Sequence, residues 1–388
     1  MGAALLAPVR ALASAVKPVM VRGLDIFPIE IPVSRAEHDA GVDHRFTVVR
    51  VDTDAGVRGY SFAGPPSPRA LAEGRTILVG QDLFAIERHL RHGLIRWGGI
   101  EHALWDAIGK VAGQPVSKLL GGTSDRVKAY VTCVWKGKMD QSHVSYDDQA
   151  AMAAKLKRAG FKGMKIRAWR PDPMDDVAAC RAIKKAVGPD FAVMFDRTAH
   201  RPEDVGQKVW DYETGRKVAR GLQEAGAGWL EEPFARDDYQ SPARLAAEID
   251  MPITGGEGYV GLDGFRECAT HKTYDILQPE GSGCGGILTC VKVAALAQAF
   301  QLPCILHGSM ALRVAGWLQA TLAIGSDWQE LALVAPPLLP EEQWAPGLKV
   351  LKSAKMFAIE EGMILAPAYP GIGLDLDEDA IERFRVRR

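Results

Sequence analysis

Charged side chains recur along the second half of the sequence at intervals of roughly one strand–helix unit. Counted from Asp196, successive members are separated by 35, 26, 23, 27 and 23 residues. The members are Asp196, Glu231, Glu257, Glu280, His307 and Glu330. Carboxylates can hold a divalent cation or exchange protons, and a histidine titrates near neutral pH. The regular spacing predicts that one repeating fold brings these groups together.

Short apolar runs rich in β-branched and aromatic residues contain or precede these side chains. They predict eight strands, at residues 128–135, 163–169, 191–196, 228–232, 251–257, 274–280, 303–308 and 327–334. The segments between them, such as DDQAAMAAKLKRAG and DDVAACRAIKKAVG, have helical periodicity and end in glycine, a common helix terminator. Eight such repeats over about 200 residues predict an α/β fold, a (β/α)8-type TIM barrel. A doubly wound sheet is the alternative, but the glycine fingerprint expected after its first strand is missing.

The flanking segments predict further units. Residues 18–126 contain a predicted hairpin, FTVVRVDTDAGVRGYSF, and a helical stretch broken by Gly-Gln-Pro. We expect them to form an α+β capping domain before a catalytic barrel at 127–345. Residues 346–388 are too short for a domain and are predicted to pack back on the capping domain. Residues 1–17 are weakly signal-like and are predicted to be a disordered leader.

Composition excludes several classes of protein. The net charge of the 388 residues is −1, and no long basic block indicates a nucleic-acid partner. No apolar run reaches the roughly 18–20 residues of a membrane helix. The six cysteines form no C-x-x-C pair, which indicates a reduced, cytoplasmic protein without disulfides or a zinc knuckle.

The strand ends predict a metal site. In barrels of this kind catalytic groups lie at the C-terminal ends of the strands. Asp196, Glu231 and Glu257 would meet there, and three carboxylates stay ionised side by side only if a cation joins them. All-oxygen ligation favours Mg²⁺. Glu232 is the competing ligand, because side chains alternate along a strand and only one of the two glutamates can point inward.

The remaining strand ends predict acid–base and binding groups. Lys165 and Arg167 are two residues apart and therefore share one face of their strand. His307 follows Glu280 by one strand–helix unit, so the carboxylate is expected to orient the imidazole and raise its basicity. The glycines of GSGCGG, at 281–286, are expected to shape the loop around Glu280.

These motifs resemble the enolase superfamily and, within it, the mandelate racemase subgroup, over nearly the whole chain. IEHALWDAIGKVAGQPVSKLLGG resembles the end of the family's capping domain, and MKIR stands where the family has Lys-x-Lys. FDRT, WLEEP and TGGE resemble its metal-ligand segments, and YPGIGLDLD its C-terminal return. The resemblance implies that Asp196, Glu231 and Glu257 bind Mg²⁺.

The resemblance also implies roles for the other residues. His307 with Glu280 would form a histidine–carboxylate dyad, Glu330 would hydrogen-bond the substrate carboxylate, and Lys165 would contact that carboxylate or tune a second base. The sequence departs from the family pattern with Arg167 for the usual lysine, Glu280 for aspartate and Thr198 for asparagine. A segment at 199–215 extends the third loop.

The implied chemistry is abstraction of the proton α to a carboxylate, with the enediolate stabilised on Mg²⁺. Arginine, with a pKa of roughly 12.5 or more, is a poor base but can hold a carboxylate. His307 is then the one tuned acid–base group, able to take the α-proton and protonate a departing β-hydroxyl. The sequence therefore predicts a hydro-lyase that dehydrates an acid sugar to a 2-keto-3-deoxy acid.

Two alternatives remain open. One is a racemase or epimerase of a 2-hydroxy acid with Lys165 as the second base. The other is a metal-binding homologue without turnover. The expected partner is a small-molecule carboxylate substrate, with no nucleic acid and no membrane, and the family resemblance suggests a homo-oligomer. The polar segment around His38 and His44 is expected to close over the barrel, and His102 to pack in a helix.

Overall fold

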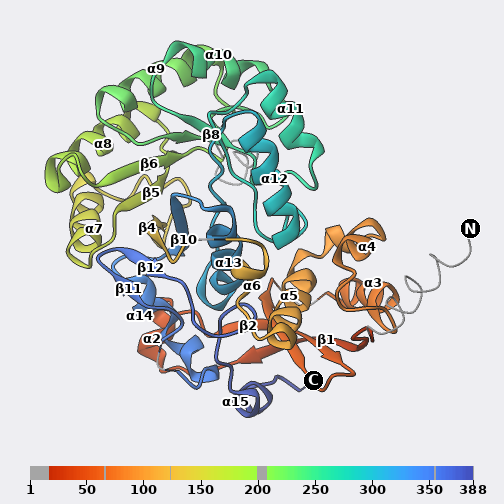
Figure 1. Cartoon of the computed structure of the whole chain (residues 1–388). Helices are drawn as coiled ribbons and strands as arrows, with labels where there is room; N and C mark the ends of the chain where they lie inside the picture. Colours follow the sequence, from red (N-terminus) through yellow and green to blue (C-terminus); the bar gives the residue numbers. More distant parts are fainter. Residues whose placement is uncertain (1–16, 65–66, 123, 199–207, 354, 388) are drawn as a thin grey trace, which may run out of the picture.

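The computed structural model describes residues 17–64, 67–122, 124–198, 208–353 and 355–387, which form the two lobes of Figure 1. The predicted leader, apart from Lys17, and the first part of the predicted insertion at 199–215 lie outside the described residues. In the described part of the chain, no helix is long and apolar enough to cross a membrane.

The first lobe is an antiparallel sheet packed against helices. Strands β1 (Val21–Glu30), β2 (Arg45–Thr53) and β3 (Arg58–Ala63) pair in that order, and β2 and β3 form the predicted hairpin. The helices are α2 (Arg35–Ala40), α3 (Pro68–Leu78), α4 (Ile86–Arg91), α5 (Gly98–Ala112) and α6 (Val116–Leu119). Gly113 ends α5 in the left-handed region, with φ 64°, and Pro115 precedes α6, so the Gly-Gln-Pro sequence breaks the helix as predicted.

The second lobe is a closed parallel barrel. Its strands are β4 (Arg126–Cys133), β5 (Gly163–Arg167), β6 (Ala192–Asp196), β7 (Leu230–Glu231), β8 (Ile253–Gly255), β9 (Ile276–Leu277) and β10 (Trp328–Val334). Its helices are α7 (Tyr146–Arg158), α8 (Pro173–Val187), α9 (Tyr212–Glu224), α10 (Gln240–Glu248), α11 (Asp263–His271), α12 (Ile287–Ala299) and α13 (Val314–Ile324). Strands β4 to β9 pair in chain order and β10 pairs with β4, while α7 to α12 surround them (Figure 1). The predicted barrel fold is confirmed.

The predicted seventh strand, at 303–308, is the exception. It makes only isolated bridges, Leu277 with Cys304 and Glu280 with His307. The amides of Ile305 and His307 donate to the carbonyls of Leu277 and Pro279. In a regular parallel ladder residue 279 would donate back, but a proline has no N–H to donate. Pro279 therefore interrupts the ladder where this segment closes the barrel.

The C-terminal segment, which was predicted to pack back on the capping domain, contacts both lobes. It follows α14 (Pro340–Trp344) and contains β11 (Ile359–Glu360), β12 (Met363–Leu365) and α15 (Glu378–Arg383). Strand β12 pairs antiparallel with β4 and so extends the barrel sheet. Beyond α15, the Arg385 guanidinium lies 2.8 Å from Asp25 of β1, which returns the chain to the first lobe.

Helix α5 of the first lobe fastens the barrel loop that follows β9. The Glu101 carboxylate accepts hydrogen bonds from the amides of Ile287 and Leu288, the first residues of α12, at 2.8 and 3.0 Å. His102 Nε2 donates to the carbonyl of Gly281 at 2.8 Å. A β-carbon at Gly286 would overlap the Glu101 carboxylate. The absence of a side chain at Gly286, within GSGCGG, therefore also allows α5 to approach this loop closely. The sequence pattern did not predict this contact.

Because His102 is buried, the stability of the folded protein depends on pH. The ring is buried against Trp317, and burial lowers its pKa from 6.5 to about 4. The folded state therefore binds this proton less tightly than the unfolded state. The stabilisation is fully present above pH 6.5 and is lost as the pH falls through 4.

We expect the free energy of unfolding to fall between pH 7.5 and 5 by about 2 kcal/mol more in the wild type than in H102Q. Glutamine keeps a donor for the Gly281 carbonyl but does not titrate. Urea unfolding at the two pH values measures the difference. Equal losses in the two proteins would show that His102 does not titrate with unfolding.

Candidate active site

A buried lysine lies at the centre of the converging strand ends. Lys165 Nζ is 2.7 Å from Glu231 Oε2, 3.0 Å from Glu330 Oε1 and 3.7 Å from Asp196 Oδ2. Its side chain has no exposed surface. Burial alone would lower the pKa of Lys165, but the surrounding carboxylates outweigh burial and raise it. The lysine therefore holds its proton and neutralises part of the acidic cluster.

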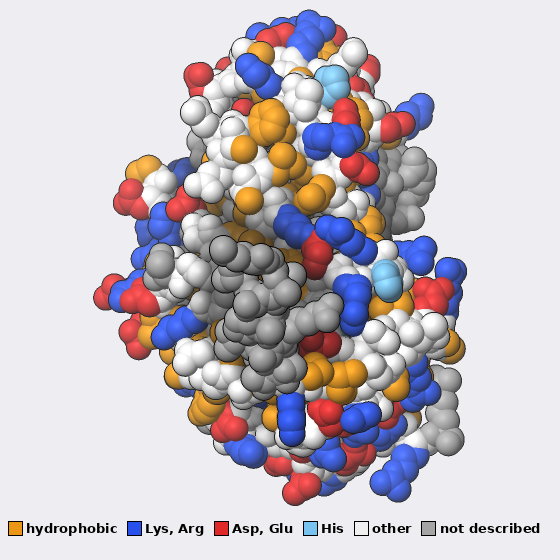
Figure 2. Space-filling view, turned by 45° about the vertical axis from the view of Figure 1, so that its right-hand side comes forward, with side chains coloured by type: hydrophobic (Ala, Val, Ile, Leu, Met, Phe, Trp, Pro, Cys, Tyr) orange, Lys and Arg blue, Asp and Glu red, His pale blue; other side chains and the backbone are white. Residues whose placement is uncertain are grey.

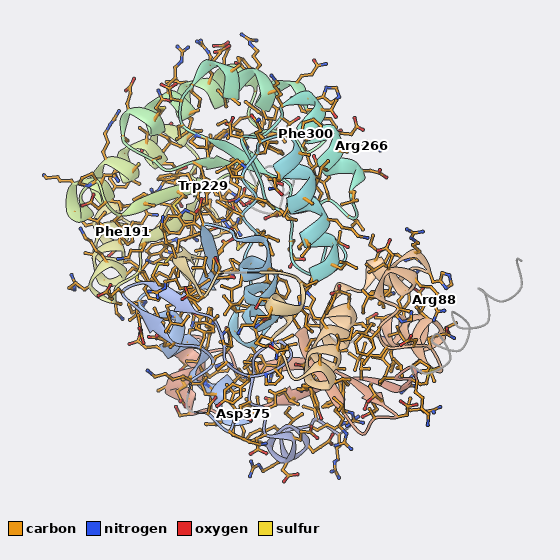
Figure 3. The ribbon with its side chains drawn as sticks, viewed as in Figure 1. Arg88, Phe191, Trp229, Arg266, Phe300 and Asp375 are labelled. Atoms are coloured by element: carbon orange, nitrogen blue, oxygen red, sulfur yellow. The ribbon has the colours of Figure 1, made fainter. Side chains whose placement is uncertain are left out.

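The cluster rests on an apolar floor inside the barrel. This layer consists of Tyr130, Met194, Trp229, Ile276 and Ile305, all buried. Figure 3 labels Trp229 within the ring of strands, and its indole N–H lies 3.4 Å from Glu231 Oε2. Such a floor keeps water from the carboxylates, so they must be neutralised by side chains or by a bound cation.

The choice between the paired glutamates is resolved by their orientation. Asp196 and Glu231 are register partners on adjacent strands, and the Glu231 carboxylate reaches Lys165. Glu232 adopts a left-handed backbone, with φ 44°, and its carboxylate lies 3.5 Å from the Arg236 guanidinium. Strand alternation allows only one of these two glutamates to point into the barrel, and that residue is Glu231.

The donor set suits a divalent ion. Ligand atoms of Glu231, Glu257 and His307 all lie within 4.8 Å of one another. Glu231 Oε1 is buried and has no hydrogen-bond partner among the described residues. Burial, followed by the neighbouring Asp196, raises the pKa of Glu231 to about 8. An orphaned oxygen in a surplus of carboxylates fits a hard cation such as Mg²⁺.

Asp196 and Arg167 differ from expectation. Asp196 does not belong to that group of three, and the Arg167 guanidinium contacts its carboxylate. Arg167 also donates to Thr198 Oγ1 at 2.6 Å. Arg167 on β5 and Asp196 on β6 are register partners, so the anion nearest to Arg167 is the Asp196 carboxylate. The predicted Arg167 contact with a substrate carboxylate thus competes with an ion pair that the sequence did not predict.

His307 and Glu280 are adjacent, but the expected hydrogen bond between them is not formed. His307 Nε2 lies 2.9 Å from Glu257 Oε2, and its buried Nδ1 has no hydrogen-bond partner in the described part of the chain. The Glu280 carboxylate instead accepts hydrogen bonds from the amides of Ser282 and Gly283 in its own loop. Burial would lower the pKa of His307, but the Glu257 contact raises it to about 10.

Glu330 is held as an acceptor. It accepts hydrogen bonds from the Gly308 amide at 2.6 Å and from the Thr132 hydroxyl. Burial would raise its pKa, but Lys165 and then His307 lower it to about 2. An ionised Glu330 can accept a hydrogen bond from a substrate hydroxyl, whereas the predicted bond to a substrate carboxylate would require a proton on Glu330.

A cavity of about 460 Å³ opens at this end of the barrel. Its lining includes Arg167, Glu257, Glu280, His307 and Glu330, which the sequence predicted. It also includes Trp169, Arg236 and Arg313, which the sequence analysis missed. Trp169 and Arg236 lie in loops beyond the strand ends and Arg313 lies in a short helical turn, where spacing carries no signal. His38 and His44 are not among the described lining residues, and their rings pack on each other at 5.6 Å.

Comparison with known proteins places this geometry in a family. Residues 25–121 match the mandelate racemase / muconate lactonizing enzyme N-terminal domain, and residues 148–380 match the enolase C-terminal domain-like family. The chain is 30% identical to a D-galactonate dehydratase of Ralstonia nicotianae, covering 88% of this chain and 91% of that protein. It is 28% identical to a D-galactarolactone cycloisomerase of Agrobacterium fabrum, with 87% and 91% covered. A solved D-glucarate dehydratase from Agrobacterium tumefaciens, complexed with magnesium, has a TM-score of 0.80 at 27% identity, with 95% and 99% covered.

The donor set predicts stoichiometric metal binding. We expect metal-stripped protein to bind one Mg²⁺ per chain in isothermal titration calorimetry. E231Q and E257Q should each weaken binding by about 10- to 100-fold or more, because loss of even an outer-shell partner has an effect of that size. D263N, which changes an exposed aspartate on α11, is the matched control and should bind as the wild type does. Unchanged affinity in both glutamine variants would contradict the site.

Proposed function

Because the chain belongs to the mandelate racemase / muconate lactonizing enzyme family of the enolase superfamily, we propose that it is a Mg²⁺-dependent acid-sugar dehydratase. It would remove the proton α to a carboxylate and expel the β-hydroxyl as water, giving a 2-keto-3-deoxy acid. Two of the three relatives described above are dehydratases of sugar acids. The observation that carries the proposal is a histidine beside a carboxylate cluster at the mouth of the barrel.

The metal would be held by Asp196, Glu231 and Glu257. When bound, Mg²⁺ supplies electrostatic stabilisation for the negative charge that develops on the substrate carboxylate. Lys165 balances the charge of the cluster from below, since it contacts both Glu231 and Glu330. Its full burial and raised pKa suit an electrostatic role better than proton transfer.

His307 is the proposed acid–base group. A base must be unprotonated, and the Glu257 contact favours the protonated ring. A Glu257 carboxylate committed to a cation no longer holds that proton, which leaves His307 able to accept the α-proton. The same nitrogen then returns the proton to the departing hydroxyl, so one water leaves and the proton count balances.

Glu280 is proposed to orient the His307 ring. The two residues are bridge partners, and Nδ1 of His307 is a buried nitrogen that needs a partner. The Glu280 side chain would have to leave the amides of Ser282 and Gly283 to reach it. Arg167 lines the cavity and is proposed to contact the substrate carboxylate or to assist proton donation.

An isomerase is the second candidate, and the cycloisomerase relative favours it. A racemase needs a base on each face of the α-carbon, and Lys165 is the residue proposed for that second role. Three carboxylates hold the proton on Lys165, which argues against this alternative. A metal-binding homologue without turnover is the third candidate.

We further propose a small-molecule acid-sugar substrate, a cytoplasmic location and a homo-oligomeric assembly. All six cysteines are free thiols in the described chain, in keeping with a reducing compartment. On the face shown in Figure 2, basic and acidic side chains are interspersed, which is in keeping with a small-molecule partner.

Incubation with Mg²⁺ and a panel of acid sugars in D₂O tests the reaction. We expect the wild type to form 2-keto acids and H307N to form none, because asparagine cannot accept the α-proton at neutral pH. Keto-acid assays and NMR of the α-position provide the readouts, and circular dichroism checks that H307N is folded.

Other outcomes separate the alternatives. Exchange of the α-proton for deuterium without a keto acid would identify an isomerase. Magnesium binding without either signal over the whole panel would support the homologue without turnover. Keto-acid formation by H307N would show that another residue is the base.

A further inference from the structure

Three arginines line the cavity, and two of them are paired with carboxylates. Arg167 contacts Asp196 at the metal-binding end. Arg236 lies 3.5 Å from Glu232 and 3.9 Å from Glu257, and its guanidinium packs where a β-carbon of Gly258 would stand. Both guanidinium groups therefore already balance acidic residues of the barrel.

Arg313 is different. It ends the short 3-10 helix η3 (Ala311–Arg313), directly before α13, and its side chain lines the cavity. It is half-buried, yet its guanidinium forms no hydrogen bond or ion pair with any residue that the structure describes. It is the single cavity-lining arginine of this kind within the described ranges.

Two carboxylates are close enough to influence Arg313 but are engaged elsewhere. Burial lowers the pKa of its guanidinium, and Glu280 and Asp43 act in the opposite direction. The Glu280 carboxylate accepts hydrogen bonds from the amides of its own loop. The Asp43 carboxylate accepts one from Gln343 Nε2 at 3.4 Å. The five guanidinium donors of Arg313 thus stay available to a ligand in the cavity.

An unpaired, half-buried guanidinium favours an anion. Removing a charge from water without a partner is unfavourable, and a carboxylate offsets this with two parallel N–H···O bonds. In the proposed reaction the reacting carboxylate lies at the other group of residues, beside the proposed metal ligands Glu231 and Glu257. The cavity of about 460 Å³ falls within the ~300–1,000 Å³ usual for small-molecule sites.

We propose that Arg313 binds a second carboxylate of the substrate, so that the enzyme acts on sugar diacids, which carry a carboxylate at each end, in preference to monoacids. This inference rests on the proposed dehydratase function and adds to it the class of acid sugar. Arg313 is then a residue that determines specificity by contact with the end of the substrate that does not react.

The test compares paired substrates. A six-carbon diacid and the monoacid with the same hydroxyl configuration are assayed with Mg²⁺ for keto-acid formation, alongside a monoacid phosphorylated at the far end. We expect the wild type to have the highest kcat/KM on the diacid. R313Q should raise KM for the diacid by about tenfold or more, the loss expected for a charge-assisted contact, and should change KM for the monoacid far less.

Two further variants complete the design. R313K keeps the charge without the planar fork and should recover part of the affinity for the diacid. R266Q removes an exposed arginine on α11, labelled in Figure 3, whose ion pairs are with Asp263 and Glu267, and should behave as the wild type does. Thermal unfolding of each variant verifies that the fold is intact.

The outcomes distinguish this inference from the proposed function. Equal kcat/KM values on the two acids, or equal losses on both in R313Q, would overturn the role of Arg313 while dehydration stands. A preference for the phosphorylated monoacid would overturn the assignment to a carboxylate. If no acid is dehydrated, diacid binding to the wild type and R313Q, measured by calorimetry with Mg²⁺, still tests Arg313: binding that the substitution weakens supports the site, and its absence refutes it.

Discussion

The contacts of Lys165 constrain the rest of this molecule. A lysine without exposed surface lies between Glu231, Glu330 and Asp196 above an apolar floor. Buried charges persist only when each has a partner, so the strands that carry these four residues must keep their register. A slip of one residue would turn each charge toward the surrounding helices and bring an apolar side chain into the barrel. Because the acidic cluster must be neutralised, it constrains the register of the strands and requires positively charged partners for the carboxylates.

Much of the fold and the identity of most site residues could be predicted from the sequence, because both follow from periodicity. Alternating apolar runs and amphipathic segments specify a barrel, and the residue at each strand end then faces its mouth. His307 and Glu257 line the cavity for this reason, and Glu330 reaches it from within β10. The inward choice of Glu231 over Glu232 required the backbone, since both occur at the same strand end.

The sequence could not predict which hydrogen-bond or ion-pair partner each charged side chain contacts. Arg167 has two candidate anions, a substrate and Asp196, and the nearer one is set by strand register. The Glu280 carboxylate has two candidate partners, the His307 ring and its own loop amides, and it accepts from the amides. Arg313 lies beyond a strand end in a helical turn, where neither spacing nor motif marks it. Such preferences depend on distances of a few ångströms, which a linear pattern does not encode.

The missing ladder bond at Pro279 has a consequence for how the barrel moves. Because Pro279 has no N–H, the segment at 303–308 receives one backbone hydrogen bond fewer than a regular parallel ladder would provide. His307 lies on this segment, whereas Asp196 and Glu231 lie on paired strands. We therefore expect the backbone at His307 to open locally more readily than the paired strands that carry Asp196 and Glu231. The proposed acid–base residue and two of the proposed metal ligands thus lie on parts of one barrel that differ in how regularly their backbones pair.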